Sequence, residues 1–340
     1  DIPGTALAEG LTWDWETYPQ YLDAVQRMQP ALNVVGMVGH CAMRYHVMGE
    51  RSLTDEPATP AELEQMRRIA EESVAGGAVG FSTSRILLHV IPDGRYVPGT
   101  LAPIDEYLAI ADGMNAAGGG LFQSVNDFAT KADHEITLLR EMARSCGDVL
   151  FSGGAGNGGN AGIEMFQKFL DDVNANDGRM TIATQTRPSG SLCGLAQISP
   201  VKGKKWKALL SLPTLEARVA ALKDPAIRAE LEAEGHEPDY HEEGGDSLAD
   251  LAAKQGRHPV EVIIDRLIES DGHELFNTWF FNRNVAGLKQ LLTFDHVYPG
   301  LADTGAHAGQ ICDADMGTHY LTYWARDRKR GPTLPLALMV

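Results

Sequence analysis

Short apolar runs alternate with amphipathic helical segments along most of this chain, and this alternation limits the possible folds more than any other feature. Helices are predicted between the runs, for example over 59–74, where Thr59 precedes Pro60 at the first helical position. A strand–helix repeat implies a parallel sheet with helices outside it. The runs predicted as strands are 33–38, 78–81, 120–125, 149–151, 180–184, 275–281 and 296–302.

Polar residues gather where several of these runs end. Arg44 follows the first run, Ser82, Ser84 and Arg85 follow the second, and Gln123 lies near the end of the third. In barrels of parallel strands the loops after the strands carry the chemistry, whereas an open doubly wound sheet concentrates polar residues at one switch point. The spread over several strand ends therefore favours a (β/α)8 TIM barrel.

We expect residues 1–340 to form one incomplete barrel domain with a helical insertion. From 199 to about 256 the pattern changes to short helices rich in Glu, Ala and Lys, which is where the insertion is predicted. The chain begins at Asp1 inside the strand–helix repeat and has apolar ends. We therefore expect a fragment whose first barrel strand or strands lie upstream of Asp1.

The densest group of ionisable residues lies near the C-terminal end. Asp303 ends the last predicted strand, and residues 303–319 hold two histidines and three aspartates, with no Lys or Arg before Arg326. An isolated aspartate at such a place usually caps a helix or turn. A solvated charged face, however, would mix both signs, so this density indicates a functional site that contains Asp303 and His307.

The net charge of −17 excludes some classes of partner. Nucleic acids and anionic membranes require a basic surface, so neither is expected as a partner, and a small-molecule substrate remains open. No run of 18 apolar residues occurs, so no membrane-spanning helix is predicted. The oligomeric state is left open by the sequence.

The cysteines and glycines exclude other classes. The four cysteines are widely spaced without a CxxC pair, which indicates neither a disulfide framework nor a structural zinc cluster. A cytoplasmic location is expected, and any signal peptide would lie upstream of Asp1. The glycine-rich stretch 152–160 lacks the Lys and Ser or Thr of a nucleotide P-loop.

Four segments together resemble a known family. They are His40-Cys-Ala-Met-Arg44, Gly76-Gly-Ala-Val-Gly-Phe-Ser82-Thr83-Ser84, Val97-Pro-Gly99 and Gly300-Leu-Ala-Asp303-Thr-Gly-Ala-His307. In this order, they resemble the N-acyl-D-amino-acid deacylases, or D-aminoacylases, of the amidohydrolase superfamily. The resemblance implies a zinc-dependent barrel hydrolase, with a flanking β domain missing here, that cleaves the amide C–N bond of an N-acyl-D-amino acid.

The resemblance also implies roles for particular residues. Asp303 matches the catalytic carboxylate that takes a proton from metal-activated water and gives it to the leaving nitrogen, and it is a candidate metal ligand. An arginine fork is the natural partner of a substrate carboxylate. The residues expected to bind substrate are Arg44, Ser82, Ser84, Arg85, Gln123 and His307.

Two positions depart from the family pattern. The family's histidine ligands align with Gln123 and Gly153, and neither residue is a competent zinc ligand. The remaining family ligands would lie upstream of Asp1. Three alternatives stay open: one metal held by upstream residues with Asp303 and His307, a different constellation for a related amide, or a barrel that binds a small ligand without hydrolysis. Asp303 and the polar strand ends favour an enzyme.

Overall fold

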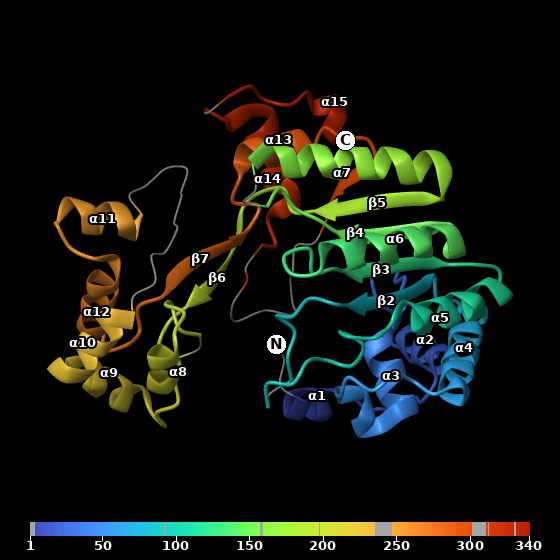
Figure 1. Ribbon diagram of the computed structural model, residues 1–340, viewed down its shortest axis with the longest axis horizontal. Helices are drawn as coiled ribbons and strands as arrows, with labels where there is room; N and C mark the ends of the chain where they lie inside the picture. Colours follow the sequence, from blue (N-terminus) through green and yellow to red (C-terminus); the bar gives the residue numbers. More distant parts are fainter. Residues whose placement is uncertain are drawn as a thin grey trace.

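The computed structural model describes residues 4–91, 93–156, 159–196, 198–234, 247–300, 311, 313–329 and 331–340. Its centre is a parallel six-stranded sheet in the order β1-β2-β3-β4-β5-β8 (Figure 1), which confirms the predicted parallel sheet. The strands are β1 Val38–Gly39, β2 Gly80–Ser84, β3 Leu121–Val125, β4 Asp148–Ser152, β5 Arg179–Thr184 and β8 Val297–Pro299.

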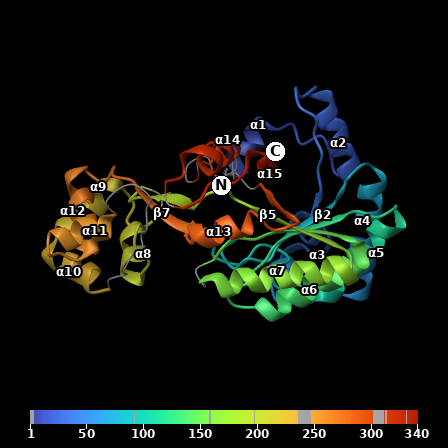
Figure 2. The same cartoon turned by 90° about the horizontal axis from the view of Figure 1, so that it is seen from above.

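Helices precede and connect these strands. The predicted helix start at Thr59 is confirmed, because its side chain accepts from the backbone of Glu62 while Glu62 accepts from the backbone of Thr59. Figure 2 shows α6 and α7 together on one side of the sheet. The helical segments up to β5 are α1 Gly4–Gly10, α2 Tyr18–Arg27, α3 His40–Met48, η1 Gly49–Leu53, α4 Pro60–Ala75, α5 Ile104–Ala116, α6 Ala132–Cys146 and α7 Gly159–Asn176.

The two faces of the sheet differ in burial. One face carries fully buried apolar side chains from successive strands, including Phe81, Phe122, Phe151 and Ile182, which belong to the main core with the connecting helices. Alternate residues on the other face are only half-buried. The sheet is thus packed on its outer face and open on the face that lines the interior of a barrel.

The first strand is shorter than predicted. The sequence predicts a strand over 33–38 that is buried on both faces, but β1 covers only Val38–Gly39, and Val34 and Val35 are 49% and 71% exposed. That prediction is wrong because β1 is an edge strand that pairs with β2 alone among the described residues. An apolar run does not reveal whether it has a neighbour on both sides.

The predicted strand at 275–281 does not join the barrel sheet. It forms β7 Phe276–Phe281, which pairs antiparallel with β6 Ser189–Cys193 in a separate ribbon that we call the arm (Figure 1). β6 contains Gly and Ser and carries no apolar run, so no local pattern predicts this strand as a partner. The arm leads to helices α8 Lys204–Leu210, α9 Leu215–Lys223, α10 Pro225–Glu234, α11 Leu248–Lys254 and α12 Pro259–Glu269.

Two further apolar clusters complete the described part of the chain. The arm helices enclose their own core around Trp206 and Ile263. The second cluster contains the fully buried Trp324 and joins the C-terminal helices to Ala155 and to Ile163 of α7. None of the helices within the described ranges has both the length and the apolar character needed to span a bilayer. The C-terminal helices are α13 Val285–Leu291, α14 Met316–Thr322, η2 Tyr323–Asp327 and α15 Leu336–Met339.

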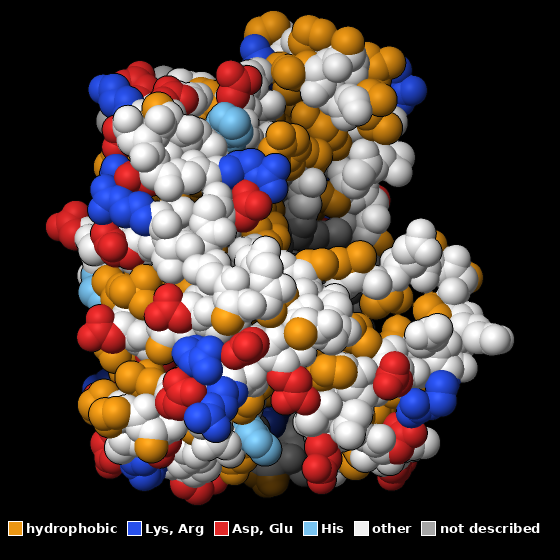
Figure 3. Space-filling view, turned by 90° about the vertical axis from the view of Figure 1, so that its right-hand side faces the viewer, with side chains coloured by type: hydrophobic (Ala, Val, Ile, Leu, Met, Phe, Trp, Pro, Cys, Tyr) orange, Lys and Arg blue, Asp and Glu red, His pale blue; other side chains and the backbone are white. Residues whose placement is uncertain are grey.

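The surface where the strands begin carries both signs of charge. Figure 3 shows acidic and basic side chains interspersed on this side of the molecule, which is the right-hand side of Figure 1. This mixture provides no continuous basic surface for a polyanion on the face shown.

Candidate functional site

The parallel strands all end on the side of the sheet that faces the arm (Figure 1). We call this side the mouth and define it by the strand-end residues Ser84, Val125, Ser152, Thr184 and Pro299. Ser82, Ser84 and Gln123, which are predicted to bind substrate, lie on β2 and β3, two of the strands that end here. The mouth is therefore the place to compare the predicted site with the structure.

The structure brings two of the predicted substrate-binding residues together. Ser82 and Gln123 are register partners on adjacent strands β2 and β3, and both are half-buried on the open face of the sheet. Ser84, two residues farther along β2, has its hydroxyl oxygen 2.5 Å from His89 Nδ1. These three polar side chains line one edge of the mouth, and their substrate-binding role stays a prediction.

Arg44 lies on α3, where its buried side chain contacts Glu106 of α5. Its side chain is 3% exposed and donates from Nε to Glu106 at 2.9 Å. The two terminal nitrogens donate to the backbone carbonyls of Ser52 and Glu56, each at 2.9 Å. All three guanidinium nitrogens thus have partners inside the protein, and this geometry gives Arg44 a structural role beside the predicted substrate-binding one.

Arg85 has a similar environment. Its Nε donates to the Glu135 carboxylate at 2.9 Å, and one terminal nitrogen donates to the Tyr107 hydroxyl at 2.8 Å and to the Ala102 carbonyl at 3.0 Å. The side chains of Arg85 and Glu135 are 2% and 1% exposed. Two buried ion pairs therefore join the segments that follow β1 and β2 to α5 and α6. They are Arg44 with Glu106 and Arg85 with Glu135.

His40, directly after β1, belongs to the first of these networks. Burial lowers the pKa of the His40 imidazole because it disfavours the charged ring, and Glu106 opposes this only in part. The neutral ring donates from Nε2 to Glu106 at 2.8 Å and accepts at Nδ1 from the Thr83 hydroxyl at 2.9 Å. Its ring also contacts Gly99 closely, since a Cβ there would lie 2.5 Å from Nδ1.

This arrangement predicts a pH dependence of stability. Below about pH 6.5 an unfolded histidine takes up a proton, whereas folded His40, with its lowered pKa, stays neutral. The unfolding free energy should therefore fall as the pH drops from about 7 to 5, with His40 contributing at most about 1.4 kcal/mol per pH unit. Denaturant unfolding at several pH values checks this.

The matched variants are His40→Gln and His273→Gln, the second at an exposed histidine. His40→Gln should flatten the pH dependence, and His273→Gln should leave it as in the unaltered protein. An identical slope in the unaltered protein and in His40→Gln would contradict the assignment of a neutral buried ring.

Asp303 and His307, the centre of the predicted site, lie outside the described residues. The chain on either side of them meets the mouth. The Gly300 amide donates to the Thr184 carbonyl at 2.9 Å, and Asp313 pairs with Arg187 at 2.7 Å. Neither Arg187 nor Asp313 is among the residues predicted to bind substrate or metal, although each stands in a polar stretch that follows a predicted strand.

Asn282 is another mouth residue that sequence reasoning missed. It follows β7 with a positive φ of 54°, and its buried side chain accepts from the Ala155 amide at 2.8 Å and donates to the Gln185 carbonyl at 2.8 Å. It thus joins the loop after β4 to the end of β5. A lone asparagine gives no signal of such a bridge in a sequence.

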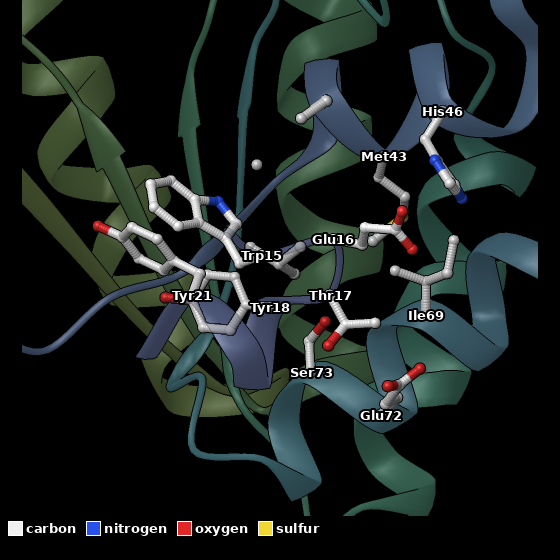
Figure 4. Close-up of a pocket in the computed structure, with 13 residues that line it drawn as sticks. Trp15, Glu16, Thr17, Tyr18, Tyr21, Met43, His46, Ile69, Glu72 and Ser73 are labelled. Carbon is white, nitrogen blue, oxygen red and sulfur yellow. The ribbon is translucent and has the colours of Figure 1, made fainter. Parts of the chain in front are cut away.

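A pocket of about 330 Å³ opens beside β1, between α2, α3 and α4. Figure 4 shows Trp15, Tyr18 and Tyr21 gathered at one side, with Glu16 and Glu72 also lining the pocket. Two carboxylates would repel an acidic substrate such as an N-acyl amino acid. We therefore place the candidate site at the mouth and not in this pocket.

The residues at the family's metal-ligand positions do not fit a metal. A Cβ at Gly153 would lie 2.9 Å from Ile182 Cγ2, so the packing leaves no room for a histidine unless Ile182 moves. Gln123 offers only a neutral amide in place of an imidazole. Across the described ranges, no three or more His, Cys, Asp or Glu side chains form a group that could hold a metal ion.

The relatives found by sequence comparison include D-amino-acid deacylases and uncharacterized mycobacterial proteins. No protein-family model matches the chain. D-aminoacylase of Alcaligenes xylosoxydans xylosoxydans is 32% identical over 144 residues, which cover 42% of this chain and 26% of that protein. N-acyl-D-aspartate deacylase of the same organism is 29% identical over 125 residues, covering 37% and 22%.

Two solved structures of D-aminoacylase, one of them described with a binuclear metal centre, match 95% of this chain. Their TM-scores are 0.57 and 0.56, at 19% identity, and each match covers 58% of the solved chain. The chain thus spans about a quarter of the length of the curated relatives named above and somewhat over half of the solved structure.

The fold is a partial (β/α) barrel like that of the D-aminoacylase structures, with six parallel strands in the part of the chain that is described, which confirms the predicted fold class. The predicted resemblance to the N-acyl-D-amino-acid deacylases is confirmed at modest sequence identity.

Proposed function

We propose that this protein is a hydrolase that cleaves the amide C–N bond of an N-acyl-D-amino acid. The similarity to D-aminoacylase is the main support for the proposal. The two sequences are 32% identical over 144 residues, and the fold matches over 95% of the chain. The polar mouth supports it, since Ser82, Ser84 and Gln123 lie on the side of the sheet where such barrels place their chemistry. The substrate is then a small molecule.

In this proposal Asp303 is the general acid and base. Amide hydrolysis needs two proton transfers: one from the attacking water and one to the leaving nitrogen. One carboxylate can perform both in turn. Asp303 lies four residues after Pro299, where β8 ends, and the Gly300 amide donates to the Thr184 carbonyl at the end of β5. The proposal therefore assigns its carboxylate a role at the mouth.

We also propose that catalysis requires a metal ion, as the described binuclear centre of the neighbouring D-aminoacylase suggests. Gln123 and Gly153 would not contribute to it, so its ligands would come from outside the described residues, Asp303 among them. The number and kind of metal are left open.

A second candidate is a barrel that binds N-acyl amino acids without cleaving them. The observation that favours it is the pair Gln123 and Gly153, which replaces two family ligands by residues that cannot bind zinc well. Binding of an N-acyl amino acid without release of the free amino acid would favour this second candidate over the hydrolase.

The assay follows amine release from N-acetyl-D-methionine, N-acetyl-D-glutamate and their L forms by the full-length protein. We expect release from a D substrate at a rate at least tenfold above that from its L form, and loss of the activity after dialysis against a chelator. Restoration by added divalent metal controls for damage during dialysis. Equal rates for the D and L forms, or no release from either, would contradict the proposed function.

A further inference from the structure

We propose that Arg187 is a positioning residue that acts through Asp313 to hold the C-terminal segment against the base of the arm at the mouth. Its effect on turnover rests on the proposed function, whereas its effect on local structure does not. We define the base of the arm as residues 185–189, which join β5 to β6.

The contact between the two segments is a mostly buried ion pair. Arg187 Nη2 donates to Asp313 Oδ1 at 2.7 Å, and the side chains are 21% and 6% exposed. The Ser189 hydroxyl donates to the other oxygen of Asp313, and Arg187 also reaches Asp315 at 2.9 Å. Charge-assisted hydrogen bonds of this kind fix distance and direction together.

Neighbouring bonds join the same two segments. The Thr186 hydroxyl donates to the Met316 carbonyl at 2.9 Å, and the buried Trp324 indole donates to the Thr186 carbonyl at 2.6 Å. Thr184, just before the base of the arm, accepts from the Gly300 amide. The chain that carries Asp303 is therefore bonded to residues 184–189 on both sides, at Gly300 and at Asp313.

The charges around Arg187 favour positioning over direct contact with the substrate. Two aspartates, Asp313 and Asp315, face one guanidinium, so the local charge is negative and would repel a substrate carboxylate. Arg187 Nε is shielded from solvent and has no hydrogen-bond partner in the part of the chain that the structure describes. The side chain is directed toward the C-terminal segment, because Nη2 donates to both Asp313 and Asp315. It therefore acts on the reaction through the placement of that segment.

The test compares Arg187→Lys and Asp313→Asn with the unaltered full-length protein. Arg179→Lys is the matched control, because Arg179 pairs with Asp148 at the other end of β5 and is 71% exposed. We expect both mouth variants to lower kcat at least tenfold with KM within about twofold, since misplacement of a reacting group by a small distance slows the chemical step. The control should change neither constant.

Hydrogen exchange followed by mass spectrometry supplies a readout that does not depend on activity. Amides of 313–324 should exchange at least tenfold faster in both mouth variants and at the original rate in Arg179→Lys. A raised KM with unchanged kcat would make Arg187 a substrate contact and overturn the proposal, as would unchanged exchange. Faster exchange in a protein that hydrolyses no N-acyl amino acid would contradict the proposed function and leave the structural coupling supported.

Discussion

Replacing Asp303 by asparagine should lower kcat for an N-acyl-D-amino acid by about a hundredfold to ten-thousandfold, the usual contribution of a general acid–base group. Asparagine has nearly the same size and can still accept a hydrogen bond, but it cannot take up and release the proton that amide cleavage requires. The thermal unfolding midpoint should stay near that of the unaltered protein.

The control for this experiment is Asp327→Asn, an equal change at an exposed aspartate that pairs with Arg326. It should leave both kcat and the unfolding midpoint as they are. Full activity in Asp303→Asn would remove the proton-transfer role from this residue. If calorimetry shows that Asp303→Asn still binds the substrate without cleaving it, the loss of activity lies in the chemical step.

Replacing Arg85 by methionine should destabilise the protein by about 3–5 kcal/mol, because it leaves the buried carboxylate of Glu135 without its charged partner. The Tyr107 hydroxyl and the Ala102 carbonyl also lose their donor. Arg95→Met, on the same connection between β2 and α5, removes a 45% exposed arginine that pairs with Asp93 and should change stability by less than about 1 kcal/mol.

This comparison also decides between two roles for Arg85. The sequence resemblance predicts that Arg85 binds the substrate carboxylate, whereas the structure surrounds it with internal partners. Denaturant unfolding of both variants, with KM measured on the folded protein, separates the two. An Arg85→Met protein of unchanged stability but raised KM would favour the substrate-binding prediction over the structural one.

The strand–helix alternation predicted most of the main sheet, because strands packed against helices on one face carry apolar runs that a sequence displays. It failed at two places where the neighbour of a strand decides its structure. Residues 33–37 are predicted to be part of a buried strand but lie at the edge of the sheet. Residues 275–281 are predicted to be a barrel strand, but they pair with Ser189–Cys193 in the arm. Pairing between distant segments leaves no local pattern.

The candidate site was predictable in part for the same reason. The proximity of Ser82 and Gln123 could be predicted, because each lies near the end of a predicted strand and the two strands are neighbours in the sheet. The partners of Arg44 and Arg85 did not, because Glu106 and Glu135 lie on helices where acidic residues usually face water. The closed packing of Ile182 against Gly153 is a property of the folded core that composition does not encode.

Hydrolysis in water enriched in oxygen-18 tests the central claim most directly. If the protein cleaves the amide C–N bond of an N-acyl-D-amino acid, mass spectrometry should find one labelled oxygen in the released carboxylic acid and none in the free D-amino acid. Intact substrate after prolonged incubation with metal-supplied protein, or a label in the amino-acid product, would contradict it.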